Sequence, residues 1–301
     1  MLLIPVAGAD LLPGFTVIGL VNGGTFALLA IGLVLIYRVS GVLNFAHGAV
    51  AMFGTFCAYQ VSIKWHQPAV LGLVVAVAVG MALGYIIERT TIRPLAARST
   101  LVRTTVTIGW LLVLQQVAGL IWGMNSYHQA VRVVPLSRLF TAPGGAPVAT
   151  DQLLTVTAAI ALALGVAAIL RFTSLGAQVR AVADDPTAAR LWGINVDRVS
   201  SFSWMVGCGM AAVAGVLLTP RLNFDQISLT VLVIEGLIAA VIGGLSSLPL
   251  TVVGAFVLGV AEEWPRAFAP GRVGIDKFVA VIVVVAILVL RPPKSLGSRA
   301  A

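Results

Sequence analysis

The sequence has no glycine-rich loop of the kind that binds nucleotide phosphates. None of its three lysines, Lys64, Lys277 and Lys294, follows a glycine, so the pattern GxxxxGK[ST] is absent. That loop cradles phosphates with its backbone amides. The chain therefore lacks this way of binding ATP, and any ATP-driven work in which it takes part requires a motor on another polypeptide.

Motifs of hydrolytic and metal-dependent catalysis are also missing. The sequence contains no HExxH, no GxSxG and no cluster of cysteine and histidine residues. Its two cysteines, Cys57 and Cys208, lie within apolar runs, where a free cysteine behaves as a small hydrophobic residue. No acidic and basic side chains are paired at a spacing suited to proton transfer. We therefore expect no enzyme activity and no metal or cofactor in this chain, and a membrane enzyme is the weakest alternative.

Charged residues are scarce, at 10% of the 301 residues, against about a quarter in typical soluble domains. Hydrophobic residues make up 59%, and the mean hydropathy is +1.03. Several apolar runs approach the ~20 residues that a helix needs to cross the hydrocarbon core of a bilayer. The strands of a membrane β-barrel would instead alternate polar and apolar residues. We therefore expect an all-α, polytopic integral membrane protein.

We expect about eight or nine transmembrane helices, some short or broken, in one transmembrane domain that covers residues 1–301. The membrane region of this domain extends over residues 14–290. The apolar runs that predict the helices lie at residues 14–37, 42–63, 68–87, 104–123, 152–170, 200–218, 231–245, 248–262 and 275–290. The runs at 231–245 and 248–262 are short and close together, which leaves open whether they form two full spans.

The basic residues favour one orientation of these helices. With alternate loops assigned to opposite sides of the membrane, most Lys and Arg residues fall on one side. Cytoplasmic loops are enriched in these residues, so that side is expected to be the cytoplasm. The C-terminus and a polar loop at residues 171–199 then lie inside, and the N-terminus lies outside. The same rule accounts for the net charge of +8, so we expect no binding to nucleic acid.

The loop at residues 171–199 contains residues that are typical of the start and the end of a short helix. Asp184 and Asp185 can cap a helix, Pro186 suits its first position, and Gly193 suits its end. A helix is therefore expected at about residues 186–192. Two helical turns are unstable alone in water, so this helix is expected to pack on its own chain or on a partner.

A second feature is the segment at residues 41–54, GVLNFAHGAVAMFG, which combines two polar side chains with helix-breaking glycines. On a continuous helix, Asn44 and His47 would share a face. Irregular backbone in a membrane is tolerated where it is buried in protein or lines a water-filled cavity. Asn44, His47 and Gly48 are therefore expected to belong to a half-helix that lines a pathway; alternatively, Asn44 and His47 form a structural pair whose side chains hydrogen-bond neighbouring helices.

Glu235 is a carboxylate within an apolar run, VLVIEGLIAAVIGG. Charged groups are costly inside a bilayer, so Glu235 is expected to line a pathway or to lie near the outer interface. Glu262 and Glu263 are expected to mark the wet end of a helix.

Two further patterns concern packing and loops. The segment between residues 124 and 150 is rich in Pro and Gly, which predicts irregular structure at the outer surface, where it can meet an extracytoplasmic partner. GxxxG spacings predict close approach of helices at Gly19–Gly23, Gly80–Gly84 and Gly119–Gly123.

Three stretches carry a resemblance to a known family. The run GLVLIYRVSGVLNFAHGAVAMFG resembles the N-terminal signature of the permease subunits of branched-chain amino acid ABC transporters, the leucine/isoleucine/valine family. GAQVRAVADDPTAARLWGINVDR is similar to the cytoplasmic loop of that family, and GLIAAVIGGLSSLPLTVVGAFVLGVAEE to its late glycine-rich hairpin. The short N-terminus and the sequence LNFAHG resemble the H-type subunit more than the longer M-type.

The resemblance implies an importer of several subunits in the bacterial inner membrane. An extracytoplasmic binding protein would deliver the substrate to two permease subunits, this chain with an M-type homologue or a second copy. Two cytoplasmic ATP-binding subunits would bind ATP and magnesium and drive alternating access. This chain would then carry no cofactor of its own.

The resemblance also implies that a coupling helix at residues 185–193 docks on an ATPase subunit. The residues expected to form or flank this contact are Arg180, Asp184, Asp185, Pro186, Arg190 and Gly193. The motif departs from the Glu-Ala-Ala start of other ABC importers, because the equivalent region here reads Arg-Ala-Val-Ala-Asp-Asp.

Substrate and mechanism leave alternatives open. Related permeases for urea and short amides tend to have Met where this chain has Phe45, which favours branched-chain amino acids. The broken segments near residues 44–48 and 243–249 resemble the discontinuous helices of secondary transporters. An ATP-independent channel or secondary transporter is therefore the second hypothesis.

Overall fold

A computed structural model describes residues 7–123, 128–134, 137–141, 147–221, 225–245, 247–268 and 274–290. Most of these residues are helical, and the predicted all-α membrane fold is confirmed. The strands in the described ranges form one short antiparallel hairpin, made of β1 (Arg138–Thr141) and β2 (Pro147–Ala149).

Six helices in these ranges are long and apolar enough to cross a membrane. They are α1 (Ala7–Ser40), α3 (Ala69–Ile87) with its π-helical extension η2 (Glu88–Ile92), α4 (Thr100–Trp122), α5 (Thr150–Phe172), α8 (Val196–Leu218) and α11 (Leu248–Phe268).

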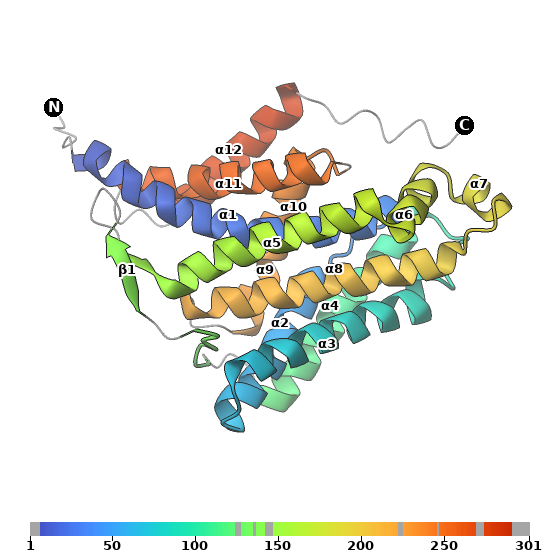
Figure 1. The fold of residues 1–301 in the computed structure, drawn as a ribbon, viewed down its shortest axis with the longest axis horizontal. Helices are drawn as coiled ribbons and strands as arrows, with labels where there is room; N and C mark the ends of the chain where they lie inside the picture. The colour runs from blue at the N-terminus through green and yellow to red at the C-terminus, as the bar shows by residue number, and fades with distance from the viewer. Residues whose placement is uncertain are drawn as a thin grey trace.

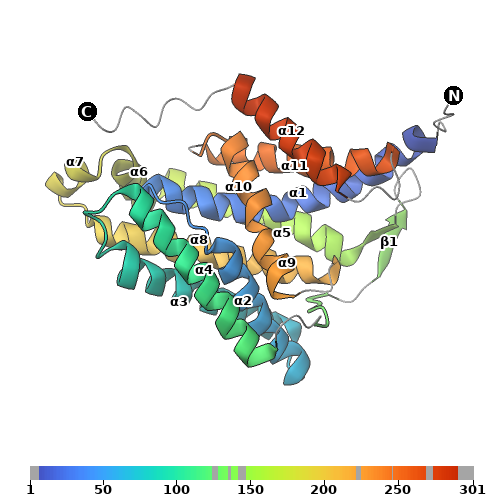
Figure 2. The same cartoon turned by 180° about the vertical axis from the view of Figure 1, so that it is seen from behind.

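The remaining expected segments are also helical, but they are shorter or broken. They are α2 (His47–Tyr59) with the π-helical η1 (Gln60–Lys64), α9 (Gln226–Val231) followed by α10 (Val233–Ile242), and α12 (Ile275–Leu290). Figure 2 shows that α9 and α10 run across α1 rather than along it. The nine apolar runs therefore all correspond to helices in the part of the chain that the structure describes.

The long helices α1, α5, α8 and α3 lie side by side in Figure 1. The β1–β2 hairpin lies at one end of this bundle, called here the hairpin end. Two short helices, α6 (Ser174–Asp184) and α7 (Pro186–Leu191), lie at the opposite end, called the α7 end. The two polar connections thus extend from opposite ends of an apolar bundle.

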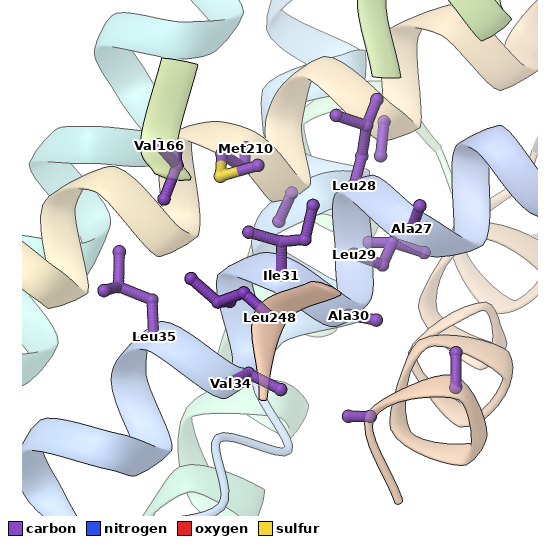
Figure 3. Packing of buried hydrophobic residues seen from close by; sticks show 14 of the residues in the cluster. Ala27, Leu28, Leu29, Ala30, Ile31, Val34, Leu35, Val166, Met210 and Leu248 are labelled. Atoms are coloured by element: carbon purple, nitrogen blue, oxygen red, sulfur yellow. The ribbon is translucent and has the colours of Figure 1, made fainter. Parts of the chain in front are cut away.

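The core is centred on α1, which is buried along most of its length by α5, α8, α10 and α11. Figure 3 shows Ile31 and Leu35 of α1 in the same cluster as Val166 of α5, Met210 of α8 and Leu248 of α11. A second cluster surrounds α2 and draws on α3, α4, α8 and α9. Helix α8 contributes to both clusters and joins the two halves of the bundle.

Glycines let several of these helices touch backbone to backbone. A Cβ added at Gly19 would lie 2.7 Å from Cα of Val260 in α11, and one at Gly80 would lie 2.8 Å from the Cys208 carbonyl oxygen in α8. The predicted packing role of the first two GxxxG pairs is confirmed. In the third pair, Gly123 instead ends α4 with a positive φ of 94°.

The expectation of irregular structure at residues 124–150 is wrong in part, because this segment contains the hairpin. Of this segment, residues 124–127, 135–136 and 142–146 lie outside the described ranges. The His128 ring packs edge-on against Phe56 and Tyr59, and the Val131 carbonyl accepts a hydrogen bond of 3.0 Å from Thr219. Part of the segment therefore packs back on the helices.

Candidate functional site

The break before α2 lies deep inside the bundle. After α1 ends at Ser40, Gly41 takes a positive φ of 67°, and the chain is not helical again until His47. His47 lies beside Gly32, since a Cβ added there would be 2.9 Å from its Cε1 atom. Gly32 precedes the end of α1 by eight residues, which is about 12 Å along a helix. The chain thus turns back into the bundle before α2 begins.

This arrangement corrects the expected continuous helix at residues 42–63. Asn44 lies in the non-helical stretch, and His47 is the first residue of α2, so the two side chains do not share a helical face. The glycine at position 41 and the buried surroundings favour the turn over continued helix. The expectation of irregular backbone at this point agrees with the structure.

Helix α4 supplies hydrogen bonds for the non-helical stretch. The Phe45 N–H donates to the Thr107 hydroxyl at 3.0 Å, and Arg103 donates to the Ser40 carbonyl at 3.1 Å. The Thr107 hydroxyl lies 2.7 Å from the Thr104 carbonyl and 3.2 Å from that of Leu43, either of which can accept its proton. These bonds matter because an unpaired backbone group in an apolar interior costs several kcal/mol, roughly. Sequence reasoning missed Thr107 and Arg103.

Asn44 and His47 are fully buried, and their polar atoms are only partly satisfied. The Asn44 amide donates to the free thiol of Cys208 at 3.7 Å, a long and weak bond. Its Oδ1 atom has no partner among the described residues. Neither nitrogen of the His47 ring has a partner at hydrogen-bonding geometry there, although the ring faces the Leu29 backbone. Such buried, unpaired groups are rare, and each calls for an explanation.

Other helices close tightly around this site. A Cβ at Gly48 would collide with the Thr230 carbonyl oxygen of α9, and one at Gly32 would lie 2.6 Å from the Gly207 carbonyl oxygen of α8. The N-terminus of α2 begins with Ala46 as its cap residue, without a side-chain hydrogen bond. The site is therefore a sealed junction of α1, α2, α8 and α9.

Glu235 belongs to a different polar cluster. It lies on α10 and pairs with Lys277 of α12, which also lies 3.3 Å from Glu262 of α11. The second oxygen of Glu235 has no partner in the part of the chain that the structure describes. The structure thus places Asn44, His47 and Gly48 together and Glu235 in a cluster between α10, α11 and α12.

The expectation that Glu262 and Glu263 mark a wet helix end is wrong, because both are buried. Helix α11 continues past them to Phe268, and basic residues neutralise them. Arg266 donates to Glu263 at 2.7 Å, and Lys277 lies beside Glu262. Buried charges of this kind are retained where they are paired.

At the α7 end, the predicted short helix is present. The Asp185 side chain accepts hydrogen bonds from the N–H groups of Thr187 and Ala188, at 2.7 and 3.0 Å. Pro186 is the first helical residue, and Gly193 has a positive φ of 79° just beyond the end. Asp184 does not cap α7, because it is the last residue of the preceding helix.

That preceding helix, α6, was not expected. The Thr173 hydroxyl caps it by accepting from the Gly176 N–H at 3.1 Å. Gly176, Val179, Val182 and Ala183 are buried, while Arg180 and Asp184 are exposed. The three- and four-residue spacing of these buried positions after Thr173 is the signal that could have predicted α6.

Sequence reasoning also missed two apolar side chains at the tip of α7. Leu191 and Trp192 are 85% and 86% exposed, and they follow the exposed Arg190. Exposed apolar side chains that lie beside each other form an apolar patch, which makes this surface a candidate for contact with a partner. The signal was present as a Leu-Trp pair in an otherwise polar stretch.

The comparisons with known proteins agree with this architecture. The profile of the family described as "Branched-chain amino acid transport system / permease component" matches residues 15–289. No solved structure matches the chain.

Three curated relatives cover almost the whole chain. The chain is 31% identical to the high-affinity branched-chain amino acid transport system permease protein LivH of Escherichia coli K12, over 93% of each protein. It is 30% identical to LivH of Salmonella typhimurium, also over 93% of each. It is 31% identical to the permease protein BraD of Pseudomonas aeruginosa, over 93% of this chain and 94% of the relative. The chain is therefore a multi-pass membrane protein that belongs to the family of branched-chain amino acid transport system permeases.

Proposed function

We propose that the chain is the transmembrane permease subunit of an ABC importer and forms the pathway for branched-chain amino acids. The proposal is supported by the similarity to LivH and BraD, two branched-chain amino acid transport permeases that match this chain over nearly all of its length. A substrate-binding protein delivers leucine, isoleucine or valine, and a second permease subunit completes the pathway. Two separate ATP-binding subunits bind ATP and magnesium and drive the cycle, so this chain is not itself an enzyme.

The α7 end is proposed to face the cytoplasm of a bacterial plasma membrane, with the N-terminus outside. Support comes from the basic residues near this end, among them Arg38, Arg93, Arg98, Arg171 and Arg198. Such enrichment is typical of the cytoplasmic side.

Helix α7 is proposed to be the part of the chain that contacts the ATPase subunit. It is a capped two-turn helix that extends from the bundle with Leu191 and Trp192 exposed. A helix this short gains stability from packing, and an exposed Trp is a frequent anchor of a binding interface. Asp185, Pro186 and Gly193 define the helix, while Arg180, Asp184 and Arg190 offer exposed charges to the partner.

Copurification of the ATPase subunit tests this assignment. Trp192→Ser is expected to weaken the association by about thirtyfold, the size typical of an interface hot spot. Replacing residues 184–190 with a Gly/Ser linker is expected to abolish it. Trp65→Ser is the matched control, because Trp65 is also exposed, at 61%, but lies after η1 in a different part of the chain. Normal association of both α7 variants would overturn the assignment.

Asn44, His47 and Gly48 are proposed to line the substrate pathway. The unpaired polar atoms of Asn44 and His47 are buried at the N-terminus of α2, in the junction of four helices. A helix N-terminus favours a carboxylate, and half-helices present such ends to anionic substrate groups in other transporters. Opening of the junction would supply the partners that these atoms lack in the closed state.

Glu235 is proposed as a second pathway group, separate from the first three. Its unpaired carboxylate oxygen can accept a hydrogen bond from the ammonium group of an amino acid. A urea or short-amide permease remains the alternative substrate class. Competition of unlabelled leucine, urea and acetamide against radiolabelled leucine uptake separates the two, since only amino acids should compete.

A further inference from the structure

Where α3 meets α8 at the α7 end, a buried carboxylate is held by a single arginine. Glu88 is only 1% exposed and begins the π-helical turn η2. The Arg93 guanidinium donates to both of its oxygens, at 3.3 Å from Nε and 2.9 Å from Nη2. This paired geometry is the strong form of an arginine–carboxylate contact.

The same arginine also forms hydrogen bonds with α8. Its Nη2 atom donates to the Ser201 hydroxyl at 2.6 Å and to the Asp197 carbonyl at 3.1 Å. Ser201 in turn donates to Glu88 at 2.8 Å. The hydrogen bond with Glu88 raises the pKa of the Arg93 guanidinium above its ordinary value. We call Glu88, Arg93 and Ser201 the Glu88 clamp.

Helix α7 is attached directly to the clamped end of α8. Only residues 192–195 separate the two helices, and the Ile194 N–H donates back to the Ala189 carbonyl at 3.0 Å. Ala189 of α7 and Val199 of α8 lie in one buried cluster. Arg190 and Asp197 also approach to 4.0 Å, but this pair is exposed and contributes little. A displacement of α7 is therefore expected to displace the first turns of α8 as well.

From the clamp, contact between α3 and α8 continues into the bundle. Gly84 faces the Trp204 carbonyl, and Gly80 faces the Cys208 carbonyl, in the same antiparallel register as Glu88 and Ser201. Cys208 is the residue that accepts the hydrogen bond of Asn44. One pair of closely packed helices thus joins α7 to the break before α2.

We propose that the Glu88 clamp makes α3 follow α8 when α7 moves, so that ATPase motion moves these two helices, which both pack on α2, together past the stretch that holds Asn44. Glu88, Arg93 and Ser201 are positioning residues in this proposal, which rests on the proposed function. A partly buried ion pair such as this one is a poor source of stability compared with an apolar contact, but it holds its partners in one geometry. Between two packed helices, the clamp resists separation and sliding at the end where force is applied.

The test measures leucine transported per ATP hydrolysed, with the chain in proteoliposomes together with its copurified partner subunits. Glu88→Gln, Arg93→Gln and Ser201→Ala are expected to lower this ratio by roughly 2- to 30-fold, the range of measured coupling changes. Association with the ATPase is expected to stay normal, because α7 is unchanged. Arg93→Lys keeps the charge but loses the two-pronged contact, so it should recover part of the ratio. Arg89→Gln is the control, since Arg89 is exposed and lies next to Glu88.

The outcomes separate this inference from the proposed function. If the unaltered complex transports no leucine, the proposed function fails. If that complex transports leucine and Ser201→Ala keeps the full ratio, the clamp proposal is wrong. Ser201→Ala decides the case even if the charge variants do not assemble, because it removes only one hydroxyl from a helix.

Discussion

At the scale of single residues, the structure depends on which hydrogen bonds the polar groups form inside an apolar bundle. The chain is not helical between Gly41 and Ala46, where it is partly buried, and Thr107 of α4 accepts a hydrogen bond from its backbone. Asn44 and His47 were recognised from the sequence because polar residues are conspicuous in an apolar run. Thr107 was not, because α4 has several threonines and only the packing shows which of them faces the break.

Thr107→Val tests this role of α4. The variant keeps the shape of the side chain but leaves the partly buried Phe45 N–H without its acceptor. We expect a loss of about 1–3 kcal/mol in the free energy of unfolding, measured as a lower midpoint of thermal unfolding in detergent. Thr105→Val is the matched control, because Thr105 is exposed and bonds only within its own helix in the described structure. Equal midpoints for the two variants would contradict the assignment.

At the scale of elements, local signals predicted α7 and missed α6. Helix α7 is determined by an aspartate cap, a proline in its first turn and a glycine just beyond its end. These signals lie within a few residues of one another, so they can be recognised in the sequence alone. Helix α6 depends on burying one face against the bundle, and such burial is a tertiary property. The pairing of α3 with α8 is likewise invisible in the sequence, although the glycines that permit it were noticed.

Gly84→Ala tests the close packing of α3 on α8. The added methyl group would meet the Trp204 carbonyl oxygen and force the two helices apart. Overpacking of this kind typically costs about 1–3 kcal/mol, so the midpoint of thermal unfolding should fall. Gly109→Ala in α4 provides the control, because no other atom lies within 4 Å of its added Cβ. A midpoint for Gly84→Ala as high as that of the control would show that these helices are not in close contact.

At the scale of the whole molecule, composition and hydropathy predicted the membrane fold and the approximate number of helices. They could not predict which helices are neighbours or how deep α2 begins, because contacts between apolar helices in lipid leave no hydropathy signal. For the same reason the sequence did not show that Glu235 lies beside Lys277 and Glu262, in a cluster apart from Asn44 and His47. Glu262 and Glu263 were misplaced because their basic partners lie in other turns and helices.

The most direct test of the whole account is ATP-dependent leucine uptake into proteoliposomes that contain this chain and its copurified partner subunits. We expect leucine to accumulate only when ATP, the ATPase subunits and the binding protein are all present. Liposomes with this chain alone should show no uptake above that of empty liposomes. Equal uptake by the chain alone, without ATP, would contradict the account and identify a channel or secondary transporter.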